Sequence, residues 1–83
     1  MNAVTATQVL DLFAQEARIE RARLQPGARV DELGIASLDL ALALFELEER
    51  FGVSITLPPA GAPLPTVGEL TQQVLAGAGA ATR

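Results

Sequence analysis

The sequence predicts a small all-α domain of three or four helices, with a long ordered loop between the first two. Its interior must be built from aliphatic side chains, because 49% of the 83 residues are hydrophobic but only three are Phe and none is Trp or Tyr. Such a composition suits helices better than a β-sandwich. Apolar residues also recur three and four positions apart in three stretches, and the one β-branched run, 53–57, has no partner strand. A chain of this length forms one domain with a small core.

The first helix is expected to begin at Thr5 or Thr7, since either hydroxyl can cap backbone N–H groups, and to run toward Arg21. Its apolar side consists of Val9, Leu10, Phe13 and Ala17. These positions fall on one side of a helix and predict that it packs against the rest of the domain.

A long ordered loop, residues 25–36, is expected after this helix. The triplet Gln25-Pro26-Gly27 stops a helix, because Pro disfavours helical geometry in the residue before it and Gly permits a turn. The residues that should hold the loop against the domain are Val30, Leu33 and Ile35.

The second helix should open at Ser37, span about Leu38 to Phe51 and close at Gly52. It carries two apolar stripes on nearly opposite sides. The stripe expected to face the core is Leu40, Leu44, Leu47 and Phe51. The other stripe is Leu38, Leu42 and Phe45.

A small domain cannot bury both sides of one helix, so the second stripe has two possible explanations. Either loop 25–36 covers Leu38 and part of the stripe, or the stripe is a docking face with an acidic rim. The acidic residues either meet basic patches of partners or form a solvated helix face. The docking residues predicted on this basis are Leu38, Asp39, Leu42, Phe45, Glu46, Glu48 and Glu49.

Between the second and the last helix, little regular structure is expected. Residues 53–57 should form an extended connector. Four of the five prolines lie in Pro58–Pro65, so this segment should hold at most a single helical turn.

The last helix is predicted to start at Thr66, with Glu69 completing a capping box, and to end near Ala76. Its apolar side consists of Val67, Leu70, Val74 and Leu75. We therefore expect a folded domain over residues 1–76 and a disordered tail, rich in Ala and Gly, over 77–83.

The composition excludes several classes of function. Without Cys or His, the chain lacks thiolate nucleophiles, the usual metal ligands and a general base near neutral pH. Ten acidic residues face six Arg, and the net charge of −4 repels nucleic acid and anionic membranes. No apolar stretch could cross a bilayer, and no signal peptide is apparent. We expect a cytoplasmic monomer that is not an enzyme and binds no metal, nucleic acid or membrane interior.

The segment Asp31–Leu40, D-E-L-G-I-A-S-L-D-L, resembles the attachment site of acyl and peptidyl carrier proteins. The following A-L-A-L-F-E-L-E-E-R-F-G-V-S-I is similar to the second helix of that family and its exit. The resemblance covers the middle third of the chain, and the flanking helices agree in placement. It implies a bundle of acyl-carrier type in which Ser37 receives 4'-phosphopantetheine from coenzyme A. The implied partners are a phosphopantetheinyl transferase and acyl-loading and acyl-processing enzymes.

Residue type and position alone also allow a simpler role for Ser37, because a Ser at a helix start caps backbone N–H groups. Both roles stay open at this point. A helix N-terminus favours anions, so a phosphodiester on Ser37 would lie in a compatible field. Gly34 fits either a close approach of loop and helix or an ordinary turn.

Three departures from the family pattern indicate unusual partners. Ala36 replaces the Asp that normally precedes the Ser, which removes a charge where the transferase and its metal ion work. Leu42 replaces an acidic residue usual in fatty-acid carriers, and the uncharged P-P-A-G-A-P-L-P of residues 58–65 replaces an acidic third helix. These changes argue against the standard fatty-acid synthase partners.

The leading hypothesis is a carrier that holds an acyl or aminoacyl group as a thioester on an arm at Ser37. It would serve a specialised lipid or polyketide-type pathway. The alternative is an unmodified adaptor of carrier-like fold that binds a partner through Leu38, Leu42 and Phe45. The sequence leaves the cargo and its chain length open.

Overall fold

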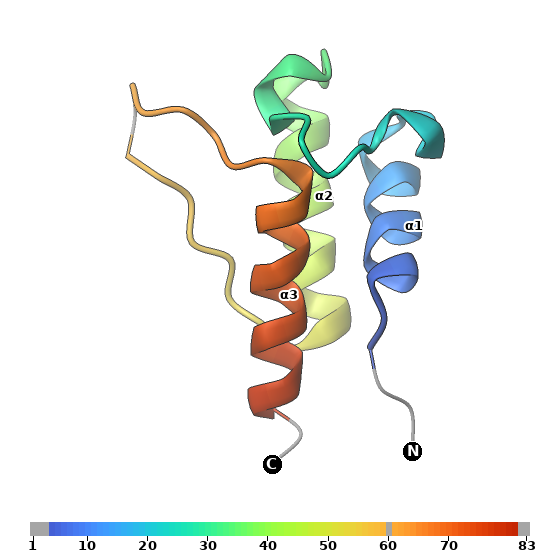
Figure 1. The fold of residues 1–83 in the computed structure, drawn as a ribbon, viewed down its shortest axis with the longest axis vertical. Coiled ribbons are helices and arrows are strands. Elements are labelled where there is room, and N and C mark those ends of the chain that lie inside the picture. Colours follow the sequence, from blue (N-terminus) through green and yellow to red (C-terminus); the bar gives the residue numbers. More distant parts are fainter. Residues whose placement is uncertain (1–3, 60, 82–83) are drawn as a thin grey trace.

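A computed structural model of the chain describes residues 4–59 and 61–81. Its helices are α1 (Ala6–Ala17), α2 (Ser37–Phe51) and α3 (Val67–Ala81), with the short 3₁₀ helices η1 (Arg21–Arg23) and η2 (Val30–Glu32) between α1 and α2. The axes of α2 and α3 point the same way, and α1 runs opposite to both (Figure 1). The all-α prediction is confirmed. Ser37 begins α2 at the end of the bundle opposite the start of α1 and the end of α3 (Figure 1).

The start of α1 is fixed by a capping box at Thr5. The Thr5 hydroxyl accepts from the N–H of Gln8 at 3.2 Å, and the Gln8 side chain accepts from the N–H of Thr5 at 3.0 Å. Of the two predicted caps, Thr5 is therefore the one used. The residues that α1 buries are Val9, Leu12, Phe13, Ala14 and Ala17.

The end of α1 differs from the prediction that the helix runs toward Arg21. The helix ends at Ala17, Arg18 adopts a left-handed conformation with φ 58°, and the N–H of Ile19 donates to the carbonyl of Ala14 at 3.1 Å. This is a Schellman ending, which usually has Gly at the left-handed position. Because residue 18 is Arg and not Gly, the sequence does not indicate that α1 ends here.

The loop after η1 packs onto the domain as predicted. A turn follows Gln25, whose carbonyl accepts from the N–H of Ala28 at 3.0 Å. Val30 and Leu33 are buried, and Ile35 is half-buried against the core. The loop is thus a packed part of the domain that brings the chain to the start of α2.

Backbone hydrogen bonds also fasten this loop to the start of α3. The N–H of Val67 donates to the Ala28 carbonyl at 2.8 Å, and the N–H of Gly68 donates to the Pro26 carbonyl at 3.0 Å. A Cβ at Gly68 would lie 3.0 Å from the same Pro26 oxygen, so the close approach favours Gly there. The first N–H groups of α3 are therefore satisfied by the loop.

The core stripe of α2 is confirmed, with one addition. Leu47 is fully buried, while Leu40, Leu44 and Phe51 are half-buried against the core. Ala43 is also fully buried, a position that the sequence analysis did not assign to the core. The helix closes at Gly52, with φ 66°, as predicted.

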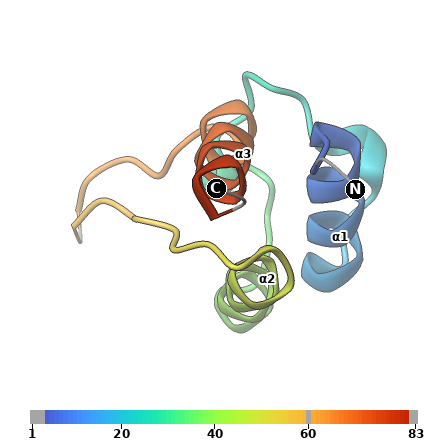
Figure 2. The same cartoon turned by 90° about the horizontal axis from the view of Figure 1, so that it is seen from below.

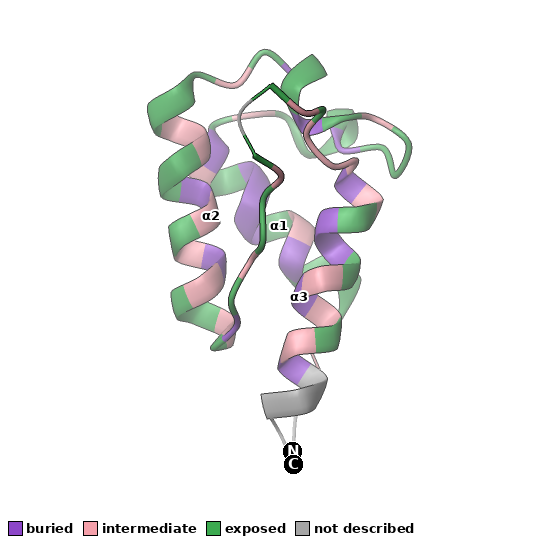
Figure 3. Cartoon of the chain, turned by 90° about the vertical axis from the view of Figure 1, so that its left-hand side faces the viewer, coloured by how far each residue is buried: buried purple, intermediate pink, exposed green. Residues whose placement is uncertain are grey.

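The connector after α2 is extended, as expected, and runs between α2 and α3 on the outside of the bundle (Figure 3). The parts of this segment on either side of residue 60 extend away from α2 and α3 (Figure 2). Thr56 fastens it to α3, since its N–H donates to Gln73 Oε1 at 2.9 Å and its carbonyl accepts from Gln73 Nε2 at 3.1 Å. Pro58, Pro59 and residues 61–66 contain no helix in the structure.

The last helix begins with the predicted capping box. The Thr66 hydroxyl accepts from the N–H of Glu69 at 3.1 Å, and the Glu69 carboxylate accepts from the N–H of Thr66 at 2.9 Å. On its apolar side Val67, Leu70 and Val74 are buried and Leu75 is half-buried.

The end of α3 lies beyond the predicted Ala76, because the helix continues to Ala81. Ala78 is buried in the core, and a Cβ at Gly77 would lie 2.9 Å from Val53 Cγ1. These contacts, and the high helix propensity of Ala, explain why the segment expected to be disordered from residue 77 is helical up to Ala81. The remainder of the expected tail, 82–83, lies outside the described residues.

Candidate functional site

The Ser37 hydroxyl is exposed at the first residue of α2 and does not cap the helix. The capping position belongs to Ala36, with φ −61° and ψ 144°, which offers no side-chain hydrogen bond. Within the described part of the chain, the Ser37 side chain takes part in no hydrogen bond. The simple capping explanation of Ser37 is therefore wrong, and the hydroxyl is accessible to another molecule.

The turn that leads to Ser37 depends on Gly34. Gly34 has φ 71°, which favours Gly, and an added Cβ would meet nothing within 4 Å. Gly34 is thus a turn residue, and the alternative of a close approach between loop and helix does not hold.

The first turn of α2 has unsatisfied donors. The first hydrogen bond of the helix runs from the N–H of Leu40 to the Ala36 carbonyl at 2.9 Å. The N–H groups of Ser37, Leu38 and Asp39 precede it, where a helix has no internal acceptors. These N–H groups and the helix dipole favour an anion next to the Ser37 hydroxyl. A phosphodiester at Ser37 fits these surroundings.

The second apolar stripe of α2 is open to solvent, as the burial colouring shows along the outer side of the helix (Figure 3). Leu38, Leu42 and Phe45 keep 70%, 49% and 55% of their surface exposed. The explanation that loop 25–36 covers this stripe is therefore wrong. We call these three residues the outer stripe.

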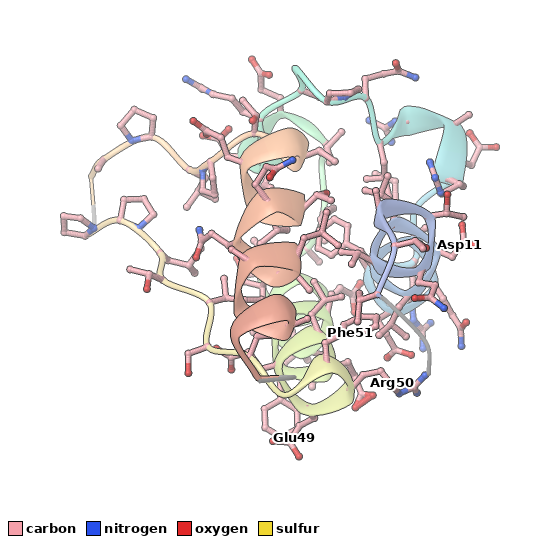
Figure 4. The ribbon with its side chains drawn as sticks, turned by 60° about the horizontal axis from the view of Figure 1, so that its bottom comes forward. Asp11, Glu49, Arg50 and Phe51 are labelled. Atoms are coloured by element: carbon pink, nitrogen blue, oxygen red, sulfur yellow. The ribbon has the colours of Figure 1, made fainter. Side chains whose placement is uncertain are left out.

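The acidic residues around the outer stripe have different surroundings. Glu49 is exposed and points away from the bundle, whereas Phe51 turns inward (Figure 4). Asp39 and Glu46 are half-buried.

Glu48 is the exception, because it binds the connector. Its Oε2 accepts from the N–H of Ile55 at 2.8 Å. Sequence reasoning missed this contact, since its partner is a backbone group whose position depends on the path of the connector. Glu48 therefore has a structural contact that the other acidic residues of the group lack in the described chain.

Residues 4–59 and 61–81 contain no group of three or more His, Cys, Asp or Glu side chains that could hold a metal ion. Nor does this part of the chain have a helix of sufficient length and apolar character to span a membrane.

Comparison with known proteins places this site in a family. Residues 7–74 match the family model of the phosphopantetheine attachment site. Acyl carrier protein AcpXL of Rhizobium etli is 39% identical over 57 residues, which are 65% of this chain and 62% of that protein. Acyl carrier protein MbtL of Mycobacterium tuberculosis is 31% identical over 75 residues, which are 89% of this chain and 88% of that protein.

The coverage of these relatives differs. The chain spans only about three fifths of the length of the AcpXL proteins, 62% in Rhizobium etli and 60% in Rhizobium meliloti. No solved structure matches it. The family model nevertheless covers most of the chain, including Ser37 and α2. The chain belongs to the acyl carrier protein family, whose domain bears a phosphopantetheine attachment site.

Proposed function

We propose that Ser37 is the attachment point of the phosphopantetheine arm and that the protein carries an acyl group on it. One observation supports this most directly. Ser37 combines an exposed hydroxyl without a capping role, unpaired helix N–H groups beside it, and a place inside the matched attachment-site region. When bound, the arm supplies a terminal thiol that holds a cargo as a thioester.

Ser37 is the substrate of another enzyme in this proposal. A Ser nucleophile needs a base to take its proton, and the chain contains neither His nor Lys. The attachment therefore requires a phosphopantetheinyl transferase, which supplies the base that takes the Ser37 proton. The Ser37 oxygen forms a bond to the phosphorus of the arm while the pyrophosphate bond of coenzyme A breaks, and adenosine 3',5'-bisphosphate leaves. The carrier itself catalyses no step.

The outer stripe of α2 is the proposed docking face for partner enzymes. Leu38, Leu42 and Phe45 start next to Ser37 and continue along the exposed side of the helix. Asp39, Glu46 and Glu49 are the proposed acidic contacts around it. Glu48 is less suited to this role because it is engaged with the connector. Since the stripe is apolar, partners should recognise it by shape and hydrophobic contact more than by charge.

The proposed cargo is an acyl group, and the proposed pathway is a specialised lipid or polyketide-type pathway. The names of the relatives, acyl carrier proteins AcpXL and MbtL, favour an acyl over an aminoacyl group. Leu42 and the uncharged segment 58–65 support partners other than the standard fatty-acid enzymes. We further propose a monomer located in the cytoplasm.

The test is modification of the whole chain with coenzyme A and several phosphopantetheinyl transferases, followed by intact mass measurement. We expect the mass to rise by one phosphopantetheine in the natural sequence and to stay unchanged in Ser37→Ala. An unchanged mass with every transferase, and also in protein purified from its own host, would contradict the proposal. If a partner still bound such unmodified protein and Ser37→Ala equally, the unmodified adaptor would be the better description.

The variant Ala36→Asp separates the fold from the attachment reaction. Asp is among the best N-cap residues and Ala among the worst, so this change should stabilise the domain by about 1 kcal/mol. It also restores the charge that a general transferase meets in the usual motif, so modification should become faster. Ala36→Asn is the matched control, because it caps the helix equally well without the charge. Equal rates for both variants would show that the charge at position 36 is irrelevant.

A further inference from the structure

A hollow of about 310 Å³ lies between the end of α1 and the start of α2, at the end of the bundle that carries Ser37. Its apolar lining consists of Ala17, Ile19, Leu33, Ile35 and Ala36. Ser37 is not part of the lining, but Ala36 before it and Asp39 after it are. Ser37 stands between these two lining residues in the sequence, so a chain attached to it starts at the same end of the bundle as the hollow.

The same hollow has a charged lining of both signs. The residues are Arg18, Glu20, Arg23 and Asp39. Neither arginine takes part in an ion pair or a side-chain hydrogen bond among the described residues. Arg21, which lies between them in the sequence, binds Asp11 at 2.9 Å and does not line the hollow. The guanidinium groups of Arg18 and Arg23 are thus available to a ligand.

Arg18 also has an unusual backbone for its type. Its φ of 58° makes it the one non-Gly residue with positive φ in the part of the chain that the structure describes. Gly would take this helix-ending position without strain, whereas an L-residue with a long side chain is disfavoured. Strained positions of this kind concentrate at functional sites. A long cationic side chain thus lines the hollow at a position whose backbone conformation favours Gly.

We propose that this hollow receives the phosphopantetheine arm while no partner enzyme holds it, an inference that rests on the proposed attachment at Ser37. The arm consists of an anionic phosphodiester, a branched apolar carbon and amide groups. Arg18 and Arg23 suit the phosphodiester, the carboxylates of Glu20 and Asp39 suit amide N–H groups, and the apolar lining suits the methyl groups.

Because the arm is tethered to Ser37, weak contacts between the arm and the hollow are sufficient to hold it there. A ligand joined to its site by a short flexible linker has an effective concentration on the order of millimolar. An intrinsic affinity in that range therefore fills the hollow for much of the time. Such a weak affinity also means that a partner enzyme can withdraw the arm at a small cost in free energy.

A different path for the arm leads to the opposite side of α2. By helical spacing, Ser37 shares a face with Leu44 and Glu48, and Glu48 contacts Ile55 of the connector. An arm that follows this face would approach Leu44 and Ile55, whereas an arm in the hollow would approach Ile19 and Ile35. The two paths are therefore distinguishable by which isoleucine the arm meets.

The experiment is NMR of the full chain, first unmodified and then modified, with the mass confirming that the arm is attached. We expect nuclear Overhauser contacts between the arm methyl groups and the side chains of Ile19 and Ile35, and shifts of the Arg18 and Arg23 side-chain signals on modification. Contacts to Leu44 and Ile55 instead, or the absence of contacts to Ile19, would overturn the inference. An unchanged mass would mean that the attachment at Ser37 has failed, which is a separate result.

The double variant Arg18→Gly, Arg23→Gln tests the charged lining. Gly at position 18 suits the left-handed backbone, so this variant should fold. A cooperative unfolding transition of the variant would show directly that it is folded. We expect the contacts from the arm to Ile19 and Ile35 to be lost. The control is Arg50→Gln, since Arg50 lines a separate hollow with Gln8 and Phe51 and its loss should leave those contacts intact. Contacts that persist in the double variant would overturn the role of the arginines.

Discussion

The two sides of α2 are both apolar, but they meet different surroundings. On the inner side, Leu47 and Ala43 are fully buried. On the outer side, Leu38 and Phe45 remain more than half exposed. Hydrophobicity alone therefore does not assign a residue to the core of this domain. The inner side supplies the stability of the fold, and we propose that the outer side is kept apolar for partners.

The largest expected effect is on stability, and it compares the inner side of α2 with its outer side. Leu47→Ala removes a fully buried side chain and should lower the free energy of unfolding by about 2–5 kcal/mol. Leu42→Ala is the matched control, because the same atoms are removed from the half-exposed outer stripe, and its loss should stay below about 1 kcal/mol. Urea unfolding of both variants measures the difference. Similar losses for the two would mean that the outer stripe also supports the fold.

The second prediction concerns docking. Phe45→Glu places a charge on the outer stripe, and it should leave the unfolding transition nearly unchanged because Phe45 is 55% exposed. If Phe45 anchors the contact with the transferase, kcat/KM for the modification of Ser37 should fall by a factor of about 30, equivalent to about 2 kcal/mol.

The control for this variant is Leu57→Glu. Leu57 is an exposed leucine on the connector, so the change adds the same charge outside the outer stripe. Its kcat/KM should stay close to that of the natural sequence. Equal losses in the two variants would point to the net charge of the protein instead of the stripe.

The sequence was most informative where local signals coincide. The bounds of α2 followed from its apolar spacing and from Gly52, and the start of α3 followed from the Thr66 and Glu69 capping box. A simple limit indicated that one side of α2 stays outside the core, since a small domain cannot bury two sides of one helix. Whether loop 25–36 covers that side was left open, and the exposure of the outer stripe became clear only from the structure. Ser37 was predicted as the attachment residue from the surrounding motif. That its hydroxyl does not cap the helix could be seen only once the first residue of α2 was known.

The missed features depend on contacts between distant segments or on unusual residues. Arg18 ends α1 in a conformation typical of Gly, so residue type gave the wrong helix end. The extra turns of α3 beyond Ala76 depend on the buried Ala78 and on the approach of Val53 to Gly77. An Ala- and Gly-rich segment looks disordered by composition until its packing partner is known.

The smallest expected effect separates the acidic residues of α2 from one another. Glu48→Ala removes the carboxylate that accepts from the N–H of Ile55 at 2.8 Å and leaves this half-buried N–H without a partner. The free energy of unfolding should fall by about 1–2 kcal/mol, since hydrogen bonds to charged groups contribute about that much at partly exposed sites. Glu49→Ala removes the same charge from an exposed position and should change stability by less than about 0.5 kcal/mol.

The variant Glu48→Gln completes this comparison, because its amide oxygen can still accept from the N–H of Ile55. If the hydrogen bond matters, Glu48→Gln should recover most of the stability that Glu48→Ala loses, and hydrogen exchange at the Ile55 amide should slow accordingly. Equal stability of the natural sequence, Glu48→Ala and Glu48→Gln would mean that the Glu48 contact does not stabilise the connector. In that case Glu48, like Glu49, would be an acidic residue available to partners.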